Sequence, residues 1–131
     1  MRKIRITAGK VSATAVLKEN TTADAIWKAL PMEVPGNTWG DEIYFGIPVH
    51  TAQAEDASDV VAMGDIAYWP PGHAFCIFFG PTPASRGKEI RAASAVNVFG
   101  KVEGDSKVFK QVKNGEKVRL EAVEPGSPQS R

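Results

Sequence analysis

The stretch GDIAYWPPGHAFCIFFGPTP, Gly64–Pro83, decides the fold of this chain. It contains two short apolar and aromatic runs, Ile66–Trp69 and Ala74–Phe79, separated by the sequence PPG. Proline fixes φ and donates no backbone hydrogen bond, so the two prolines end the first run, and the glycine after them allows the chain to turn. The stretch therefore predicts two buried strands joined by a rigid turn.

Length and composition indicate one ordinary globular domain. The 131 residues are 43% apolar and 24% charged, with a net charge of +1, so there is no electrostatic footprint for nucleic acid or an anionic membrane surface. We expect a domain over residues 1–124 and a C-terminal tail over 125–131 (PGSPQSR). The single cysteine, Cys76, lies in an apolar run and is interpreted as an inert core residue. The N-terminus reads as a strand and not as an export signal, which predicts a cytoplasmic protein with no membrane partner.

Strand patterns dominate the chain, and about eight strands are expected. The clear patterns cover Lys3–Ala8, Val11–Leu17, Glu42–Phe45, Pro48–Ala52, Ile66–Trp69, Ala74–Phe79, Ala95–Val102 and Lys117–Val123, with weaker ones after Met32 and over Val60–Met63. So many strands in a small domain favour closure into a barrel, because closure removes exposed sheet edges.

Two short helices are expected beside these strands. A helical period covers Asn20–Leu30, with Thr22 as its N-cap and a proline directly after it. A second short helix begins at Asp105 or Ser106 and ends before Asn114-Gly115. Each helix can cover one open end of a barrel.

The pattern of aromatic residues predicts aromatic side chains on both faces of the sheet. Alternation along a strand sends Phe78 and Phe79 to opposite faces, and it separates Tyr68 from Trp69 in the same way. One member of each pair belongs in the core and the other on the outer wall. The outer members either lie under loops or form a shallow apolar groove rimmed by the long surface loop Pro81–Ala92.

The sequence lacks the local motifs of common chemistry. It contains no phosphate-binding loop, no dinucleotide fingerprint, no HExxH and no CxxC. The two histidines, His50 and His73, have no spacing that would assemble a metal site, so neither a metal nor a cofactor is expected. Adjacent strand residues point to opposite faces. The acidic pairs Asp41-Glu42 and Glu55-Asp56 are therefore interpreted as solvated charge.

Two segments resemble known proteins. FFGPTP (Phe78–Pro83) and NVFGKVEGD (Asn97–Asp105) resemble the C-terminal half of cyclophilins. The longer stretch Gly64–Pro83 resembles the signature of a smaller prokaryotic family of cyclophilin-like proteins of unassigned function, whose members run the length of this chain. The resemblance implies a mainly β fold, a closed eight-stranded cyclophilin-like β-barrel with two short capping helices.

The resemblance also implies where a site would lie. Cyclophilins isomerise prolyl peptide bonds with an arginine that hydrogen-bonds the prolyl nitrogen, which lowers a rotation barrier of ~20 kcal/mol. The best match to that arginine's segment is YFGIPV, Tyr44–Val49, which has no arginine, and Val96 stands where the pocket histidine would be. The pocket phenylalanine is matched by Phe79. Arg86 and Arg91 are the candidates for a displaced catalytic arginine.

These observations favour a binding module that holds a peptide or small molecule in an apolar groove without strong catalysis. The candidate ligand-binding residues are Tyr44, His73, Phe79, Pro81, Thr82, Arg86 and Asn97. One alternative is a peptidyl-prolyl cis-trans isomerase that uses Arg86 or Arg91. Another is a structural or oligomerisation module in which the outer aromatic residues form a subunit interface. The ligand and the oligomeric state stay open at this point.

Overall fold

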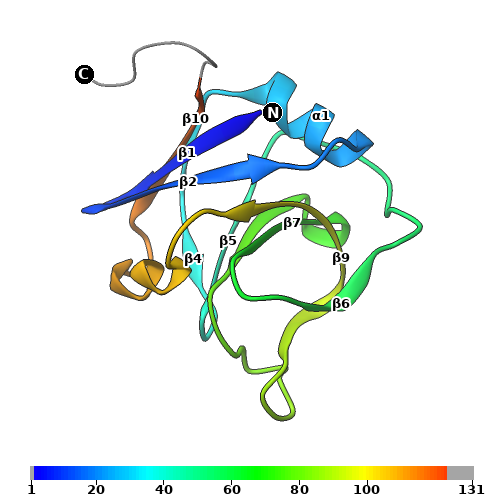
Figure 1. Cartoon of the computed structure of the whole chain (residues 1–131), viewed down its shortest axis with the longest axis vertical. Coiled ribbons are helices and arrows are strands. Elements are labelled where there is room, and N and C mark those ends of the chain that lie inside the picture. Colours follow the sequence, from blue (N-terminus) through cyan, green and yellow to red (C-terminus); the bar gives the residue numbers. More distant parts are fainter. Residues whose placement is uncertain (1, 124–131) are drawn as a thin grey trace.

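The structure, a computed structural model, describes residues 2–123, so the boundary at residue 124 and the tail 125–131 lie outside the described residues (Figure 1). The strands are β1 Lys3–Ala8, β2 Val11–Leu17, β3 Met32–Pro35, β4 Asn37–Thr38, β5 Glu42–Gly46, β6 Ser58–Val61, β7 Asp65–Trp69, β8 Ala74–Phe78, β9 Ile90–Val102 and β10 Lys117–Val123. The helices are α1 Thr21–Ala29 and the short 3-10 helices η1 Pro70–Gly72 and η2 Ser106–Gln111. The fold is therefore mainly β, as predicted.

All the strands belong to one strongly curved antiparallel arrangement (Figure 1). The pairing order is β3-β10-β1-β2-β9-β7-β8-β5-β4, and β6 pairs with β9 beside this path. Within residues 2–123 the order does not return from β4 to β3, and ten strands pair instead of about eight, so the closed eight-stranded barrel is not confirmed. The additional strands are the short segments β3, β4 and β6.

The two ends of the pairing order are consecutive in the chain and are separated only by Gly36. The Gly36 N–H donates to the Glu116 carbonyl, and the Gly36 carbonyl accepts from the Gly115 N–H, each at 2.8 Å. A Cβ at Gly36 would lie 3.0 Å from Val118 and 3.2 Å from Ile43, which is tighter than ordinary contact. Glycine is therefore suited to this crossing, where β3 leaves β10 and β4 begins to pair with β5.

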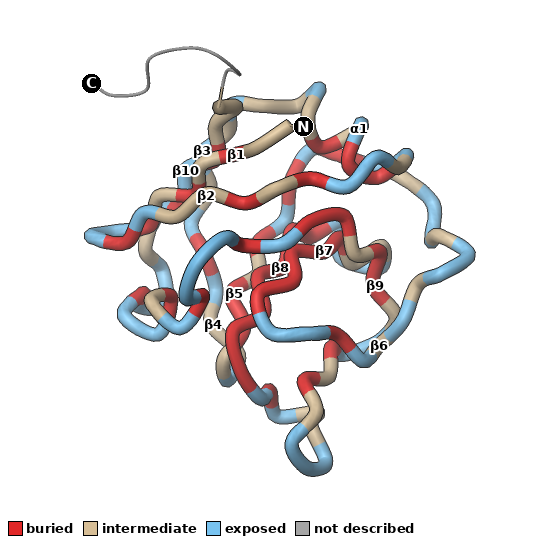
Figure 2. Tube along the Cα trace, viewed as in Figure 1, coloured by how far each residue is buried: buried red, intermediate tan, exposed pale blue. Residues whose placement is uncertain are grey.

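The signature stretch forms the predicted hairpin. Strands β7 and β8 pair with Tyr68 opposite Phe75 and Trp69 opposite Ala74, and the PPG sequence between them forms η1. His73 closes this turn with a φ of 47°, in the left-handed region. Buried residues follow both strands through the centre of the molecule (Figure 2). The expected strand Pro48–Ala52 does not form, and this segment is irregular.

Both faces of the central strands carry apolar side chains, so the protein has two apolar clusters. The inner cluster contains Tyr68, Phe79 and Phe99, and the outer cluster contains Phe78, with Trp69 packed against it. The predicted separation of neighbouring aromatic residues is confirmed. Because β8 points Phe75 and Ile77 inward, Phe79 follows them into the core, whereas Phe78 faces outward.

The helices and β9 differ from expectation at their ends. Asn20, not Thr22, caps α1, because its Oδ1 accepts from the Ala23 N–H at 2.8 Å. Asp105 caps η2 by accepting from the Lys107 N–H at 3.0 Å, which agrees with one of the two expected caps. Strand β9 begins at Ile90 rather than Ala95, so the connection after β8 is shorter than the expected loop.

We expect Phe79→Ala to lower the free energy of unfolding by about 3–5 kcal/mol, because it empties a fully packed position. Phe79 is 3% exposed, and its ring centroid lies 6.1 Å from that of Phe109. Urea denaturation measures the loss, and Val98→Ala, at a half-buried outer position, serves as the control with a smaller loss. A loss below about 1 kcal/mol for Phe79→Ala would contradict its place in the core.

Candidate functional site

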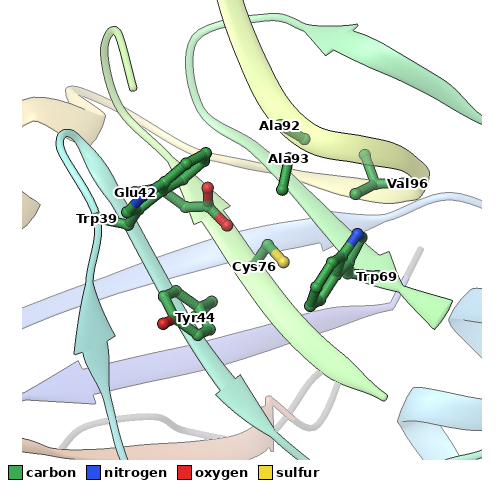
Figure 3. Close-up of a pocket in the computed structure, with 8 residues that line it drawn as sticks. All are labelled: Trp39, Glu42, Tyr44, Trp69, Cys76, Ala92, Ala93 and Val96. Atoms are coloured by element: carbon green, nitrogen blue, oxygen red, sulfur yellow. The ribbon is translucent and has the colours of Figure 1, made fainter. Parts of the chain in front are cut away.

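A pocket of about 130 Å³ opens on the outer face of the sheet (Figure 3). Its lining residues come from the segment before β5 and from β5, β7, β8 and β9: Trp39, Glu42, Tyr44, Trp69, Cys76, Ala92, Ala93 and Val96. Cavities of about this size accept a benzene-sized group. The pocket is therefore large enough for a single ring or a compact branched group.

Aromatic side chains form the walls of the pocket. Trp39, Tyr44 and Trp69 are each half-buried, and Figure 3 shows Tyr44 and Trp69 on opposite sides of Cys76. The Trp69 indole N–H donates to the Ser94 hydroxyl at 2.7 Å, which holds that ring in place. Tyr44 lies directly opposite Cys76 in the β5–β8 pairing, so the strand register places the Tyr44 wall next to Cys76 at the base of the pocket.

A buried carboxyl group lies in the pocket. Glu42 begins β5 opposite Phe78 and is only 5% exposed. Its Oε1 atom has no hydrogen-bond partner among the described residues. The neighbouring Asp41 instead lies on the other side of the chain, where its carboxylate is 3.3 Å from the Lys110 ammonium. The interpretation of this acidic pair as solvated charge is therefore wrong for Glu42, because the alternation that exposes Asp41 turns Glu42 into the pocket.

Burial changes the ionisation of the groups around this carboxyl. Desolvation raises the pKa of Glu42 from 4.5 to about 7, and the neighbouring Cys76 thiol acts in the opposite direction. Burial, followed by the charge of Glu42, raises the pKa of Cys76 well above its ordinary value. Cys76 is 2% exposed, as expected for a core residue, and its high pKa argues against a thiolate nucleophile.

Of the ligand-binding residues predicted from the sequence, Tyr44 lines the pocket. Phe79 lies in the inner core, which corrects its expected place in a groove. Thr82 is buried, and its hydroxyl donates to the Arg91 carbonyl. Asn97 is 1% exposed; its Oδ1 accepts from the Ala54 N–H at 2.8 Å. Thr82 and Asn97 therefore anchor neighbouring backbone outside this pocket, and Asn97 also lines a second hollow on the surface, beside Thr22 and Ala52.

The two candidate arginines lie outside the pocket lining. Glu89 accepts from the backbone N–H of Arg86 at 2.8 Å and from the Arg91 Nε at 3.2 Å. Arg91 also pairs with Asp59 at 2.8 Å through its Nη1. The Arg86 N–H is the main reason that the pKa of Glu89 falls to about 2. The structure thus gives Arg91 two carboxylate partners and leaves no described arginine along the pocket.

His73 and Pro81 are exposed and do not line the pocket. The ring of His73 lies 4.1 Å from the ring of His50, measured between centroids. Among residues 2–123, no group of three or more histidine, cysteine, aspartate or glutamate side chains is placed to hold a metal ion. The histidine pair is a surface contact at the turn between β7 and β8.

Sequence reasoning missed Trp39 and Glu42 as pocket residues, whereas it considered Trp69 as an aromatic residue that could face outward into a groove. The available signal was the alternation of β5, in which Ile43 and Phe45 are fully buried core residues. That pattern places Glu42 on the same face as Tyr44. The pocket stays open because neighbouring chain segments cover only part of the outer cluster. No local sequence pattern encodes that coverage.

Comparisons with known proteins agree with this fold. Residues 2–121 match the family model described as cyclophilin-like, and the chain belongs to this family. It is similar to the hypothetical protein AF2241 from Archaeoglobus fulgidus, for which a solution structure is known. The two sequences are 43% identical, the match covers 92% of this chain and 93% of that chain, and the TM-score is 0.78. The predicted membership in a cyclophilin-like family of unassigned function is thus confirmed.

A more distant likeness shows the fold alone. The chain also matches the structure of McbB in complex with tryptophan, with a sequence identity of 16% and a TM-score of 0.67. The match covers 98% of this chain but 46% of that chain. None of the curated proteins compared with the chain matches it. None of the helices over residues 2–123 is long and apolar enough to cross a membrane.

The raised pKa of Glu42 predicts a pH-dependent stability. The unfolded chain releases this proton near pH 4.5, whereas the folded protein keeps it up to about pH 7. Between these values the folded state binds more protons, so the free energy of unfolding falls as pH rises. We expect the Glu42 contribution to be at most about 3 kcal/mol, and Glu42→Gln to remove it, in urea denaturation at pH 5 and pH 8.

Asp41→Asn is the matched control and should keep the slope of the unmodified protein. Glu89 and Glu103 have lowered pKa values, so their stabilisation is lost only as pH falls below about 4.5, outside this window. An unchanged slope in Glu42→Gln would contradict a protonated, desolvated carboxyl at this position.

Proposed function

We propose that this protein is a binding module that takes one apolar or aromatic group of a small molecule or peptide into the outer-face pocket, without catalysing prolyl isomerisation. The observation that carries the proposal is the set of half-buried aromatic walls, Trp39, Tyr44 and Trp69, around a buried carboxyl oxygen that has no hydrogen-bond partner within residues 2–123. Ligand sites typically combine an apolar lining with a few placed polar groups. This pocket has that composition.

The pocket volume limits what it can hold. At about 130 Å³ it is smaller than the roughly 300–1,000 Å³ of sites that enclose a whole drug-sized ligand. It therefore holds one group, and the remainder of the ligand stays outside it. The exposed Ala93 lies at the rim, and the smaller Ala92 and Val96 side chains of β9 leave room above Cys76.

The arrangement of arginines disfavours the isomerase alternative. Isomerisation of a prolyl bond by the cyclophilin route needs a guanidinium directed at the prolyl nitrogen, but no arginine is among the pocket-lining residues. Arg91 is held by Asp59 and Glu89. The aromatic walls are only half-buried, yet they form a concave pocket, which favours a ligand over the flat contact of an oligomerisation surface.

Binding can be tested with three probes that share a ring: benzyl alcohol, benzylamine and phenylacetate. We expect at least one to perturb the fluorescence of Trp39 and Trp69 and to shift backbone amide resonances around β5 and β8. Ala93→Phe should weaken that binding about tenfold or more by filling the pocket. Ala62→Phe, at an exposed alanine outside the lining, should leave it unchanged.

Two results would overturn the proposal. One is the absence of any saturable response to all three probes at about 10 mM, a concentration that detects even weak sites. The other is prolyl isomerisation in a protease-coupled peptide assay that disappears in Arg86→Ala or Arg91→Ala. Such a loss would assign catalysis to an arginine and restore the enzymatic alternative.

A further inference from the structure

The pocket joins two features that serve the same kind of ligand. Three aromatic side chains, Trp39, Tyr44 and Trp69, surround its opening, and Figure 3 shows the Glu42 carboxyl group within the space that they border. The faces of aromatic rings carry negative electrostatic potential and attract cations. A carboxylate adds a full negative charge, and Oε1 of Glu42 has no partner in the described chain. Together they form a cage of negative potential.

We propose that the ligand group held in this pocket is an alkylammonium cation, with Trp39, Tyr44 and Trp69 as the cage and Glu42 as its counter-charge. This inference rests on the binding function proposed above and specifies the chemical class of the ligand. Aromatic cages around substituted ammonium groups use the same physical interactions. A compact ammonium group with methyl substituents also suits a pocket of about 130 Å³.

Other ligand charges fit the pocket poorly. An anion would meet the Glu42 carboxyl and the faces of the rings. Lys110, which pairs with the Asp41 carboxylate beside Glu42, and Arg91, next to Ala92, are both engaged with carboxylates. A purely apolar neutral ligand would leave the buried carboxyl oxygen without a partner, which costs free energy. A cation satisfies the rings and the carboxyl at once.

The side chains that line the pocket around Glu42 carry no other charge that changes near neutral pH. Strand β8 contributes the Cys76 thiol, whose pKa is raised by burial, and β5 contributes the Tyr44 phenol. Strand β7 contributes the indole of Trp69, and the segment before β5 contributes that of Trp39. The lining residues from β9 are Ala92, Ala93 and Val96, which carry no charge. The ionisation of Glu42 therefore sets the charge of the described pocket near neutral pH.

The test compares choline with its neutral isostere 3,3-dimethyl-1-butanol, which has nearly the same shape. The full chain carries Trp27→Phe, because Trp27 lies beside Arg2, away from the pocket, and adds background fluorescence. We expect choline to bind more tightly than the neutral isostere at pH 8. Glu42→Gln should weaken choline about tenfold to a hundredfold while leaving the isostere within about twofold.

A pH series gives a second readout that a purely structural role of Glu42 would not produce. If choline binds only the ionised form of a carboxyl that titrates near pH 7, its apparent affinity rises about tenfold between pH 6 and pH 8. The isostere should show no such rise, and Glu42→Gln should abolish it for choline. Asp41→Asn, which removes a carboxylate one residue away, should preserve the whole pattern.

The outcomes separate this inference from the proposed function. Equal binding of choline and its isostere overturns the alkylammonium assignment but leaves a ligand pocket in place. Absence of binding by choline, the isostere and the ring probes overturns both. A peptide carrying one trimethyl-lysine distinguishes the source: tighter binding of the peptide than of choline assigns the ammonium group to a protein side chain, and the reverse assigns it to a free small amine.

Discussion

The central position of β8 is the constraint on which the rest of the structure depends. This strand pairs with β5 on one side and β7 on the other, and all five of its residues are buried. A strand that is apolar on both faces needs cover on both faces. The inner face is covered by the curvature of the sheet itself, and part of the outer face is covered by β6 and the chain around Ile90 and Ala92. The pocket lies where the remaining outer cover is formed by half-buried aromatic rings.

Burying the Glu42 carboxyl in the outer face costs free energy, and packing alone does not call for a carboxyl there. An apolar residue at position 42 would satisfy the outer cluster, whereas Glu42 carries a desolvated acid with an oxygen that the described part of the chain leaves unpartnered. Local departures from good packing and polar satisfaction concentrate at functional sites. The acid, the indole of Trp69 fixed by Ser94 and the concave surface between them give this face a site-like character.

Much of the fold could be predicted from alternation and chain-breaking residues, because both act locally. The hairpin over Ile66–Phe79, the helix after Asn20 and the last strand follow from patterns within a few residues of each other. Alternation also showed that Phe78 and Phe79 point to opposite faces. It could not show which of them points inward, because that choice depends on how distant strands curve around the core.

The site was less accessible to sequence reasoning for the same physical reason. Tyr44 was found, but Glu42 resembles any surface acid until β8 is placed beside it and the outer face is covered. The polar atoms of Thr82 and Asn97 hold neighbouring backbone, a role set by loops that have no periodic signal. Arg86 and Arg91 were candidates by position, but the Arg91 guanidinium is held by Asp59 and Glu89, and the Arg86 backbone N–H donates to the same Glu89 carboxylate.

The joining of β3 to β4 through Gly36 bears on whether a strand from another copy of the chain can pair with this sheet. The strands that terminate the pairing order have only four and two residues, and the longer of them ends in a proline that cannot donate a hydrogen bond. A foreign strand would find too little unpaired backbone on either of them to extend the ladder. Both ends of the pairing order therefore offer little free backbone to a strand from another copy of the chain.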